Sequence, residues 1–341
     1  MLSFLSDYTE GAHPKVLQAL VDSNMLTLPG YGEDERCLRA KEKIRAFCGA
    51  PDADVYFLSG GTQANLVVIS TMLKRYEAVV CASTGHIQVH EAGAVEFTGH
   101  KVIPLPAEDG KLPAVALESY MERFYADETH SHMPFPGMVY LSHPTELGTL
   151  YSRAELQALA AVCRRYAMKL FLDGARLGYG LVSPASDVTV KDLVDCCDVF
   201  YIGGTKVGAL CGEAVVFPRR GMPPHFDTMA KQQGAMLAKG RLLGIQFDAL
   251  FTDGLYLELS RHAVNLAMEL KAAMLAKGYP PFIDSPTNQQ FFVLDNETLA
   301  RLREHVAFNI REPMEEDRTV IRLVTSWATK PESIEELKKL I

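Results

Sequence analysis

The fold is decided by one stretch of the sequence, Lys169-Leu170-Phe171-Leu172-Asp173-Gly174-Ala175-Arg176. Three consecutive apolar residues followed by an aspartate predict a short strand that is buried on both faces and ends in a polar turn. Strands of this kind occur in mostly parallel sheets that helices cover on both sides. Ligands of such sheets bind beyond the carboxyl ends of the strands. Asp173 and Arg176 are therefore expected beside a ligand.

The same pattern repeats on both sides of this stretch. Apolar runs occur at residues 55–58, 78–81, 101–105, 138–142, 198–202 and 214–217. Helical patterns run from 59 to about 76 and from Ser152 to Tyr166, where Ser152 and Glu155 form a capping box. This alternation predicts an α/β fold with a mostly parallel central sheet.

Three parts of the chain are predicted. Residues 1–30 form an N-terminal arm whose short helix starts near Pro14, and residues 31–250 form a large domain. That domain starts with a helix after residues 33–35, which ends at Gly49. Residues 251–341 form a small C-terminal α+β domain with strands at 291–294 and 320–324. A length of 341 residues suits two domains.

The composition argues against several kinds of binding partner and indicates the cellular compartment. The net charge is −8 and no block of lysine and arginine stands out, which argues against nucleic acid and anionic membranes as partners. No apolar run reaches the roughly 18–20 residues of a membrane span. Seven cysteines without a CxxC pair, and no leader at the start, predict reduced thiols in a cytoplasmic protein.

Two charged residues at strand ends suggest a cofactor site. Lys206 follows the run at 198–202 within Gly203-Gly204-Thr205-Lys206, so its amine is expected in tightly packed backbone. Burial lowers the pKa of a lysine and frees the amine to attack an aldehyde. Asp173 would keep a pyridine nitrogen protonated, which makes the ring an electron sink. Taken singly, a surface lysine and a helix-capping aspartate are the alternative interpretations.

Two further motifs suit the same kind of ligand. Gly61 and Thr62 open a helix, where free N–H groups and the helix dipole attract a phosphate. No Walker sequence and no GxGxxG is present, so nucleotide binding explains this turn less well. The ring of His86 could stack on a flat cofactor. His86, His90 and Glu91 do not form HExxH and lack a third ligand, so no metal site is predicted.

Taken in order, these motifs resemble the threonine aldolase family of fold type I enzymes, which use pyridoxal 5′-phosphate (PLP) and lie within the β-eliminating lyase group. The resemblance covers residues 6 to about 325. It includes the 33-residue spacing from Asp173 to Lys206. The matching segments are Ser6-Asp7-Tyr8-Thr9, Tyr31-Gly32-Glu33-Asp34, Gly61-Thr62-Gln63-Ala64-Asn65-Leu66, His86 with Glu91-Ala92-Gly93-Ala94, Asp173-Gly174-Ala175-Arg176, Lys206 and Arg322-Leu323-Val324-Thr325.

The resemblance implies an aspartate aminotransferase-like fold and a role for each matched residue. Lys206 would hold PLP as an imine and Asp173 would pair with its ring nitrogen. The other implied roles are phosphate binding by Gly61, Thr62 and Thr205, stacking on the ring by His86, a place beside the cofactor for Arg176, and binding of the substrate carboxylate by Ser6, Arg176 and Arg322. It also implies a homo-oligomer, a dimer or a homotetramer, with shared sites, in which Lys231 and Lys239 contact the phosphate of a neighbouring subunit.

The implied reaction is cleavage of L-threonine or L-allo-threonine to glycine and acetaldehyde. One departure concerns the base that removes the β-hydroxyl proton, because Glu146 stands where relatives have a histidine. His86, Glu146 or a bound water would then be the base, with His86 or a water that it positions favoured. The same PLP site would also suit β-elimination, transamination or racemisation. A non-catalytic α/β binding protein is the alternative from another class.

Overall fold

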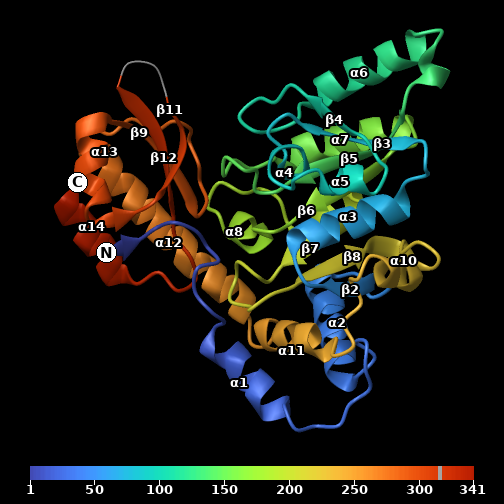
Figure 1. The fold of residues 1–341 in the computed structure, drawn as a ribbon, viewed down its shortest axis with the longest axis horizontal. Coiled ribbons are helices and arrows are strands. Elements are labelled where there is room, and N and C mark those ends of the chain that lie inside the picture. Colours follow the sequence, from blue (N-terminus) through green and yellow to red (C-terminus); the bar gives the residue numbers. More distant parts are fainter. Residues whose placement is uncertain (314–316) are drawn as a thin grey trace.

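A seven-stranded sheet lies at the centre of the fold (Figure 1). The structure, a computed structural model, describes residues 1–313 and 317–341. The strand order is β2-β8-β7-β6-β5-β3-β4. The strands are β2 Asp54–Leu58, β3 Glu77–Ala82, β4 Val102–Leu105, β5 Phe135–Ser142, β6 Lys169–Asp173, β7 Val199–Gly203 and β8 Glu213–Phe217. From β7 to β4 all neighbours are parallel, and β8 is antiparallel to β7 and β2. The predicted mostly parallel sheet is confirmed.

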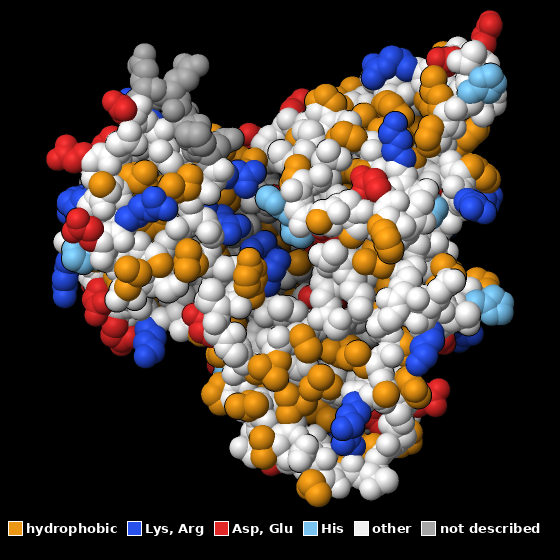
Figure 2. Space-filling view, viewed as in Figure 1, with side chains coloured by type: hydrophobic (Ala, Val, Ile, Leu, Met, Phe, Trp, Pro, Cys, Tyr) orange, Lys and Arg blue, Asp and Glu red, His pale blue; other side chains and the backbone are white. Residues whose placement is uncertain are grey.

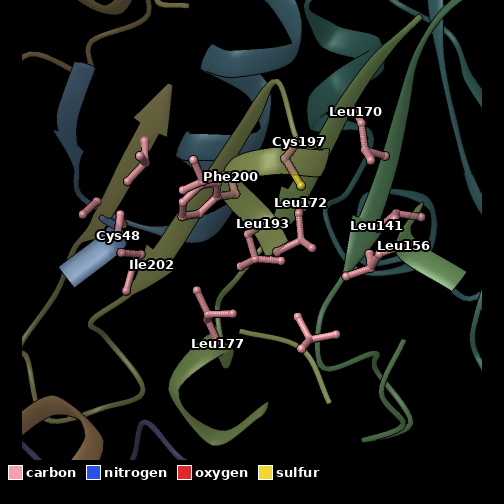
Figure 3. Close-up of a cluster of buried hydrophobic side chains, with 14 of the residues drawn as sticks. Cys48, Leu141, Leu156, Leu170, Leu172, Leu177, Leu193, Cys197, Phe200 and Ile202 are labelled. Atoms are coloured by element: carbon pink, nitrogen blue, oxygen red, sulfur yellow. The ribbon is translucent and has the colours of Figure 1, made fainter. Parts of the chain in front are cut away.

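Alternate residues of the central strands enter two separate cores. Leu170 and Leu172 of β6 pack on one side of the sheet, whereas Phe171 packs on the other. Figure 3 shows the first side, where Leu172 and Phe200 lie among leucines from the covering helices. Burying each such side chain contributes about 1.5–3 kcal/mol. Burial on both faces explains why these strands read as continuous apolar runs.

Helices surround this sheet on both faces (Figure 1). They are α2 Glu35–Cys48, α3 Gly61–Met72, α4 His86–Val89, α5 Ala94–Phe97, α6 Ala114–Ala126, α7 Arg153–Arg165, α8 Leu177–Leu181, α9 Val190–Cys196, α10 Phe226–Gln232 and α11 Arg241–Leu250.

The ends of the predicted helices test the sequence signals directly. The capping box of Ser152 and Glu155 at α7 is confirmed, as is the stop of α2 at Gly49, which has φ 59°. The helix expected to reach about residue 76 was predicted too long. Leu73 is already extended, with φ −93° and ψ 143°, and the N–H of Lys74 bonds to the Glu77 carboxylate.

A second, three-stranded sheet lies near the C-terminus in the order β11-β12-β9. Its strands are β9 Gln289–Asp295, β11 Asn309–Pro313 and β12 Arg318–Val324, and the surrounding helices are α12 Leu255–Ala276, α13 Asn296–Arg303 and α14 Pro331–Leu340. The N-terminal segment contacts this part. β1 Leu2–Ser3 pairs in parallel with β10 Val306–Ala307, and Phe4 enters the local core (Figure 1). The rest of the arm carries α1 Pro14–Ser23. The division into 1–30, 31–250 and 251–341 remains a prediction.

The described helices include none that is both long enough and apolar enough to cross a membrane.

Candidate active site

A cavity of about 630 Å³ lies between the carboxyl ends of the central strands and the small sheet. Four residues of its wall follow four neighbouring strands: His86 follows β3, Glu146 follows β5, Arg176 follows β6 and Lys206 follows β7. The small sheet supplies the facing wall with Gln289, Asn309, Ile310, Arg311 and Arg322. Figure 2 shows lysine, arginine and histidine side chains around the hollow between the two lobes. Four of the residues that sequence analysis placed at or after strand ends therefore line one cavity, and their role as a functional site remains a prediction.

Lys206 lies in backbone that leaves no room for larger neighbours. A Cβ atom on Gly203 would lie 2.4 Å from the carbonyl oxygen of Ala175, and one on Gly204 would lie 2.9 Å from that of Gly212. Burial, and then the nearby guanidinium of Arg176, lower the pKa of Lys206. A lowered pKa leaves more of the amine neutral and able to attack a carbonyl carbon.

Asp173 is buried and hydrogen-bonded through both oxygens. Its Oδ2 accepts from the Tyr140 hydroxyl at 2.5 Å and from Asn65 Nδ2 at 3.2 Å, and its Oδ1 accepts from the N–H of Ala175 at 2.9 Å. Burial alone would raise the pKa of Asp173, but the charge of His86 and these bonds outweigh burial and lower it. The carboxylate therefore stays charged, as a partner of a protonated ring nitrogen must.

His86 is held by a second buried carboxylate. Its Nδ1 lies 2.7 Å from Glu91 Oε1, and the same oxygen accepts from Asn65 Nδ2 at 2.7 Å. Burial would lower the pKa of His86, but the hydrogen bond to Glu91 and the charges of Asp173 and Glu91 together outweigh burial and raise it. Asn65 thus links the Glu91–His86 pair to Asp173. Sequence analysis gave no role to Asn65 or Tyr140. The only signal was that Asn65 lies within the segment that resembles the family.

We expect Glu91→Gln to move the acid limb of the pH–activity profile to lower pH. Glu91 stabilises the charged form of His86, so its neutral replacement lowers the pKa of His86. Neutral His86, the base that sequence analysis favours, would then persist at lower pH. The measurement is kcat against pH for the wild type and for Glu91→Gln, with the exposed Glu118→Gln as control. An unchanged acid limb in Glu91→Gln would contradict this prediction.

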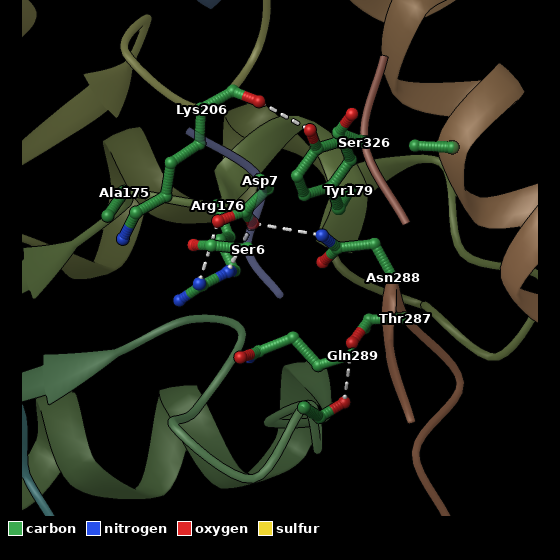
Figure 4. Close-up of polar contacts among 12 residues, drawn as sticks. Ser6, Asp7, Ala175, Arg176, Tyr179, Lys206, Thr287, Asn288, Gln289 and Ser326 are labelled. Atoms are coloured by element: carbon green, nitrogen blue, oxygen red, sulfur yellow. Dashed lines mark hydrogen bonds and ion pairs between the residues drawn. The ribbon is translucent and has the colours of Figure 1, made fainter. Parts of the chain in front are cut away.

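Arg176 is already paired within the chain. Its Nε and Nη2 bond to the carboxylate of Asp7 at 2.6 and 2.9 Å, and Asp7 also accepts from Asn288 Nδ2 at 2.9 Å (Figure 4). Arg322 faces the cavity and bonds to Gln289 Oε1 at 3.1 Å. Ser6 Oγ is buried and has no hydrogen-bond partner among residues 1–313 and 317–341. An unsatisfied buried hydroxyl beside Asp7 and Arg176 is suited to a ligand.

The remaining predicted residues, like Ser6 and Asp173, are not among the side chains that line the cavity. Gly61 and Thr62 form the first turn of α3. Thr205 donates its hydroxyl to Glu213 Oε1 at 3.0 Å, and burial raises the pKa of Glu213 to about 8. Lys231 lies over the ring of Tyr31, with Nζ 4.7 Å from the ring centroid, and Lys239 is exposed. Within the described ranges, no three His, Cys, Asp or Glu side chains gather as a metal site.

These residues fit PLP. Lys206 has an amine of lowered pKa, on which the charge of the buried Asp173 carboxylate acts, and Ser6 supplies an unused hydroxyl. A mostly parallel sheet with this lysine and this aspartate at its strand ends defines a PLP-dependent enzyme of fold type I.

The comparisons with known proteins identify the family. The model of the β-eliminating lyase family matches residues 3–291. The chain is 30% identical to the low-specificity L-threonine aldolase of a Pseudomonas species, over 98% of this chain and 95% of that one. It is 31% identical to the corresponding enzyme of Pseudomonas aeruginosa, over 98% and 96%. The chain belongs to the β-eliminating lyase family and, within it, to the threonine aldolases. The predicted family is confirmed.

Solved structures agree with this family and fold. The chain superposes on Leishmania major threonine aldolase with a TM-score of 0.95, at 42% identity over 100% of this chain and 99% of that chain. The histidinol-phosphate aminotransferase of Clostridium acetobutylicum gives a TM-score of 0.75 at 12% identity, over 100% and 98%. The second likeness shows the fold alone.

Proposed function

We propose that this chain cleaves L-threonine, L-allo-threonine and related β-hydroxy-α-amino acids into glycine and an aldehyde, with PLP as cofactor. The observation that supports this most is the meeting of Lys206, His86 and Arg322 around one cavity. In such a substrate the α-amino group would lie toward Lys206, the β-hydroxyl toward His86 and the α-carboxylate toward Arg322.

The chain's own residues hold the substrate in a fixed orientation. Arg322 binds the α-carboxylate in two-point geometry, and Ser6 donates its free hydroxyl to the same group. Arg176 is held by Asp7, so its positive charge stays in place in the wall of the same cavity. The α-amino group then lies toward Lys206, and the β-hydroxyl lies toward His86 and Glu146.

Proton movements complete the reaction. The base takes the β-hydroxyl proton, the oxygen becomes the aldehyde carbonyl, and the Cα–Cβ bond breaks. Asp173 would hold the ring nitrogen of PLP protonated, and the cofactor, when bound, would supply an acceptor for the electron pair left at Cα. A proton delivered to Cα then gives glycine. Lys206 is suited to deliver that proton, since its pKa is lowered.

His86, acting directly or through a water that it positions, is the base in this proposal. Its Nδ1 is engaged by Glu91, which leaves Nε2 for a proton from the substrate. Glu146, in contrast, is already hydrogen-bonded within the chain. Its Oε1 already accepts from the N–H of His86 at 3.0 Å and from Ser142 Oγ at 2.5 Å. Burial also raises the pKa of Glu146.

The two candidate bases predict different effects of mutation. We expect His86→Asn to lower kcat by about 100-fold or more, the usual contribution of a general base. Glu146→Gln retains the oxygen that accepts from His86 and Ser142, so its kcat should fall by less than about tenfold. Acetaldehyde release under saturating threonine gives both values. The reverse order of effects would make Glu146 the base.

The proposed reaction is tested by product analysis with threonine and allo-threonine. The PLP-loaded protein should release glycine and acetaldehyde in equal amounts. Pyruvate with ammonia would instead indicate β-elimination, a keto acid would indicate transamination, and the mirror-image amino acid would indicate racemisation. A protein with no imine absorbance and no borohydride-trapped adduct on Lys206 would be a binding protein.

The proposal includes a homo-oligomer, a dimer or a tetramer, in which sites are shared. Large apolar side chains on and after α1 are exposed, including Leu17, Val21 and Met25, and hydrophobic atoms gather over α1 and α11 in Figure 2. An exposed patch of this kind is typical of an interface. Lys231 and Lys239 would then reach the phosphate of a neighbouring subunit. Sedimentation velocity that finds only monomer would contradict this part.

A cytoplasmic location is also part of the proposal. All seven cysteines are free thiols in the structure, and most of them are buried. Free thiols are typical of proteins from reducing compartments.

A further inference from the structure

We propose that the active-site cavity contains a second carboxylate-binding position, formed by Arg311 with His90, and that the substrates include β-hydroxy-α-amino acids with an acidic side chain, such as 3-hydroxyaspartate. This inference rests on the proposed aldol cleavage and specifies its substrate class. Arg311 and His90 have no part in the mechanism above. Both line the same cavity as Lys206 and Arg322.

The backbone of β11 explains how Arg311 reaches the cavity. Asn309 is paired with Arg322 and Ile310 with Ile321, but the register then shifts between Ile310 and Glu312. Arg311 is therefore the additional residue of a β-bulge, a feature that redirects a side chain and is common next to active sites. Asn309, Arg311 and Arg322 together line the cavity from this hairpin.

A neighbouring aromatic ring fixes the direction of the Arg311 side chain. Its guanidinium carbon lies 5.8 Å from the centroid of Phe291, which is buried and lies opposite Arg322 in the pairing of β9 with β12. A cation over a ring face is held there electrostatically. The contact leaves the edge of the guanidinium, with its N–H donors, for a ligand.

His90 approaches from the opposite wall. It ends α4, and its ring centroid lies 5.7 Å from that of His86. His90 lines the same cavity as Arg311 and Arg322. Burial, the charge of His86 and then those of Arg311 and Arg322 lower the pKa of His90. A neutral imidazole there still supplies an N–H donor.

The cavity wall carries more positive charge than a substrate with one carboxylate would pair. Arg176, Arg311 and Arg322 all line this one cavity. Burial, and then the charges of Arg176 and Arg311, lower the pKa of Arg322. Asp7 pairs with Arg176, and the substrate α-carboxylate pairs with Arg322. Glu146, the carboxylate in the wall, is hydrogen-bonded to Ser142. The methyl group of threonine offers nothing to Arg311, whereas a carboxylate in its place accepts two N–H bonds from it.

The reaction of such a substrate balances without any further reagent. The β-hydroxyl of 3-hydroxyaspartate gives up its proton, the Cα–Cβ bond breaks, and the β-carbon becomes the aldehyde carbon of glyoxylate. The side-chain carboxylate stays on that product. Cα takes up a proton to form glycine.

A binding experiment separates the second position from catalysis. L-Aspartate and L-asparagine lack the β-hydroxyl and are not cleaved, and they differ only in a carboxylate against an amide. We expect the PLP-loaded wild type to bind aspartate about tenfold more tightly than asparagine, as one charge-assisted pair suggests. Arg311→Gln should remove this preference. Arg318→Gln, at an exposed arginine of β12, should keep it. Isothermal calorimetry measures all six affinities.

A kinetic experiment with matched substrates extends the test. The ratio of kcat/KM for 3-hydroxyaspartate to that for 3-hydroxyasparagine should fall about tenfold or more in Arg311→Gln and stay unchanged in Arg318→Gln. A wild type that binds aspartate and asparagine equally overturns the inference, as does the same ratio in both variants. If threonine is not cleaved while the aspartate preference depends on Arg311, the proposed function fails and the second position stands.

Discussion

Lys206→Ala is expected to abolish threonine cleavage, with kcat lower by on the order of a thousandfold or more, as for the loss of a covalent nucleophile. Burial and Arg176 shift the amine of Lys206 toward its neutral form. Without it, PLP would lack its proposed covalent attachment to the chain and the amine proposed to return a proton to Cα. Acetaldehyde release and the visible absorbance of the bound cofactor measure the two losses separately.

The control for this prediction is Lys169→Ala. Lys169 is exposed at the start of β6 and pairs with Asp198 at 3.3 Å, so its loss removes a lysine without touching the cavity. We expect its kcat within about twofold of the wild type, since exposed ion pairs contribute only about 0–1 kcal/mol. Lys206→Ala that retains a borohydride-trapped adduct, or a tenth of the wild-type rate, would assign the attachment to another lysine.

The residues that sequence reasoning placed correctly are those with local signals. Lys206 and Asp173 each follow an apolar run, and a buried strand fixes which edge of the sheet such residues reach. The helix ends at Gly49 and Ser152 were predictable for the same reason, because a cap is a property of neighbouring residues.

The contacts that give these residues their chemistry have no local signal. Asn65 and Asp173 are 108 positions apart, and Arg176 and Asp7 are 169 apart. Only the folded chain brings the two residues of each pair together. The placement of Asn65 between Glu91 and Asp173 therefore required the three-dimensional structure.

The strand β11 shows a different limit of the sequence pattern. Its residues, Asn309–Pro313, lack the alternation of apolar and polar side chains that identifies a strand. The segment is extended because it pairs with β12, in a ladder that the bulge at Arg311 interrupts. Arg311 could not be assigned to the cavity before that pairing and its bulge were known.

Asp173→Asn is expected to lower kcat by about 100-fold, or about 2.7 kcal/mol in the activation free energy. The carboxylate that burial would neutralise is kept charged by His86 and by hydrogen bonds, and that charge is what a pyridinium nitrogen requires. An amide of the same shape retains an oxygen for Tyr140 but provides no charge. The ring nitrogen of bound PLP would then lose its proton, which would weaken it as an acceptor for the electron pair at Cα.

The structural cost of the same substitution can be separated from the chemical one. The amide nitrogen of Asp173→Asn meets a donor, either the Tyr140 hydroxyl or the N–H of Ala175, and a lost buried hydrogen bond costs about 1–3 kcal/mol of stability. Cofactor absorbance and thermal unfolding report that cost, and kcat at full cofactor occupancy reports the chemistry. Asp195→Asn, at an exposed aspartate of α9, is the control. One result would contradict the electron-sink role of Asp173: an Asp173→Asn variant saturated with PLP that retains more than about a third of the wild-type kcat. That rate corresponds to a difference of roughly 0.6 kcal/mol in activation free energy, which is too small for the loss of a buried charge beside a pyridinium.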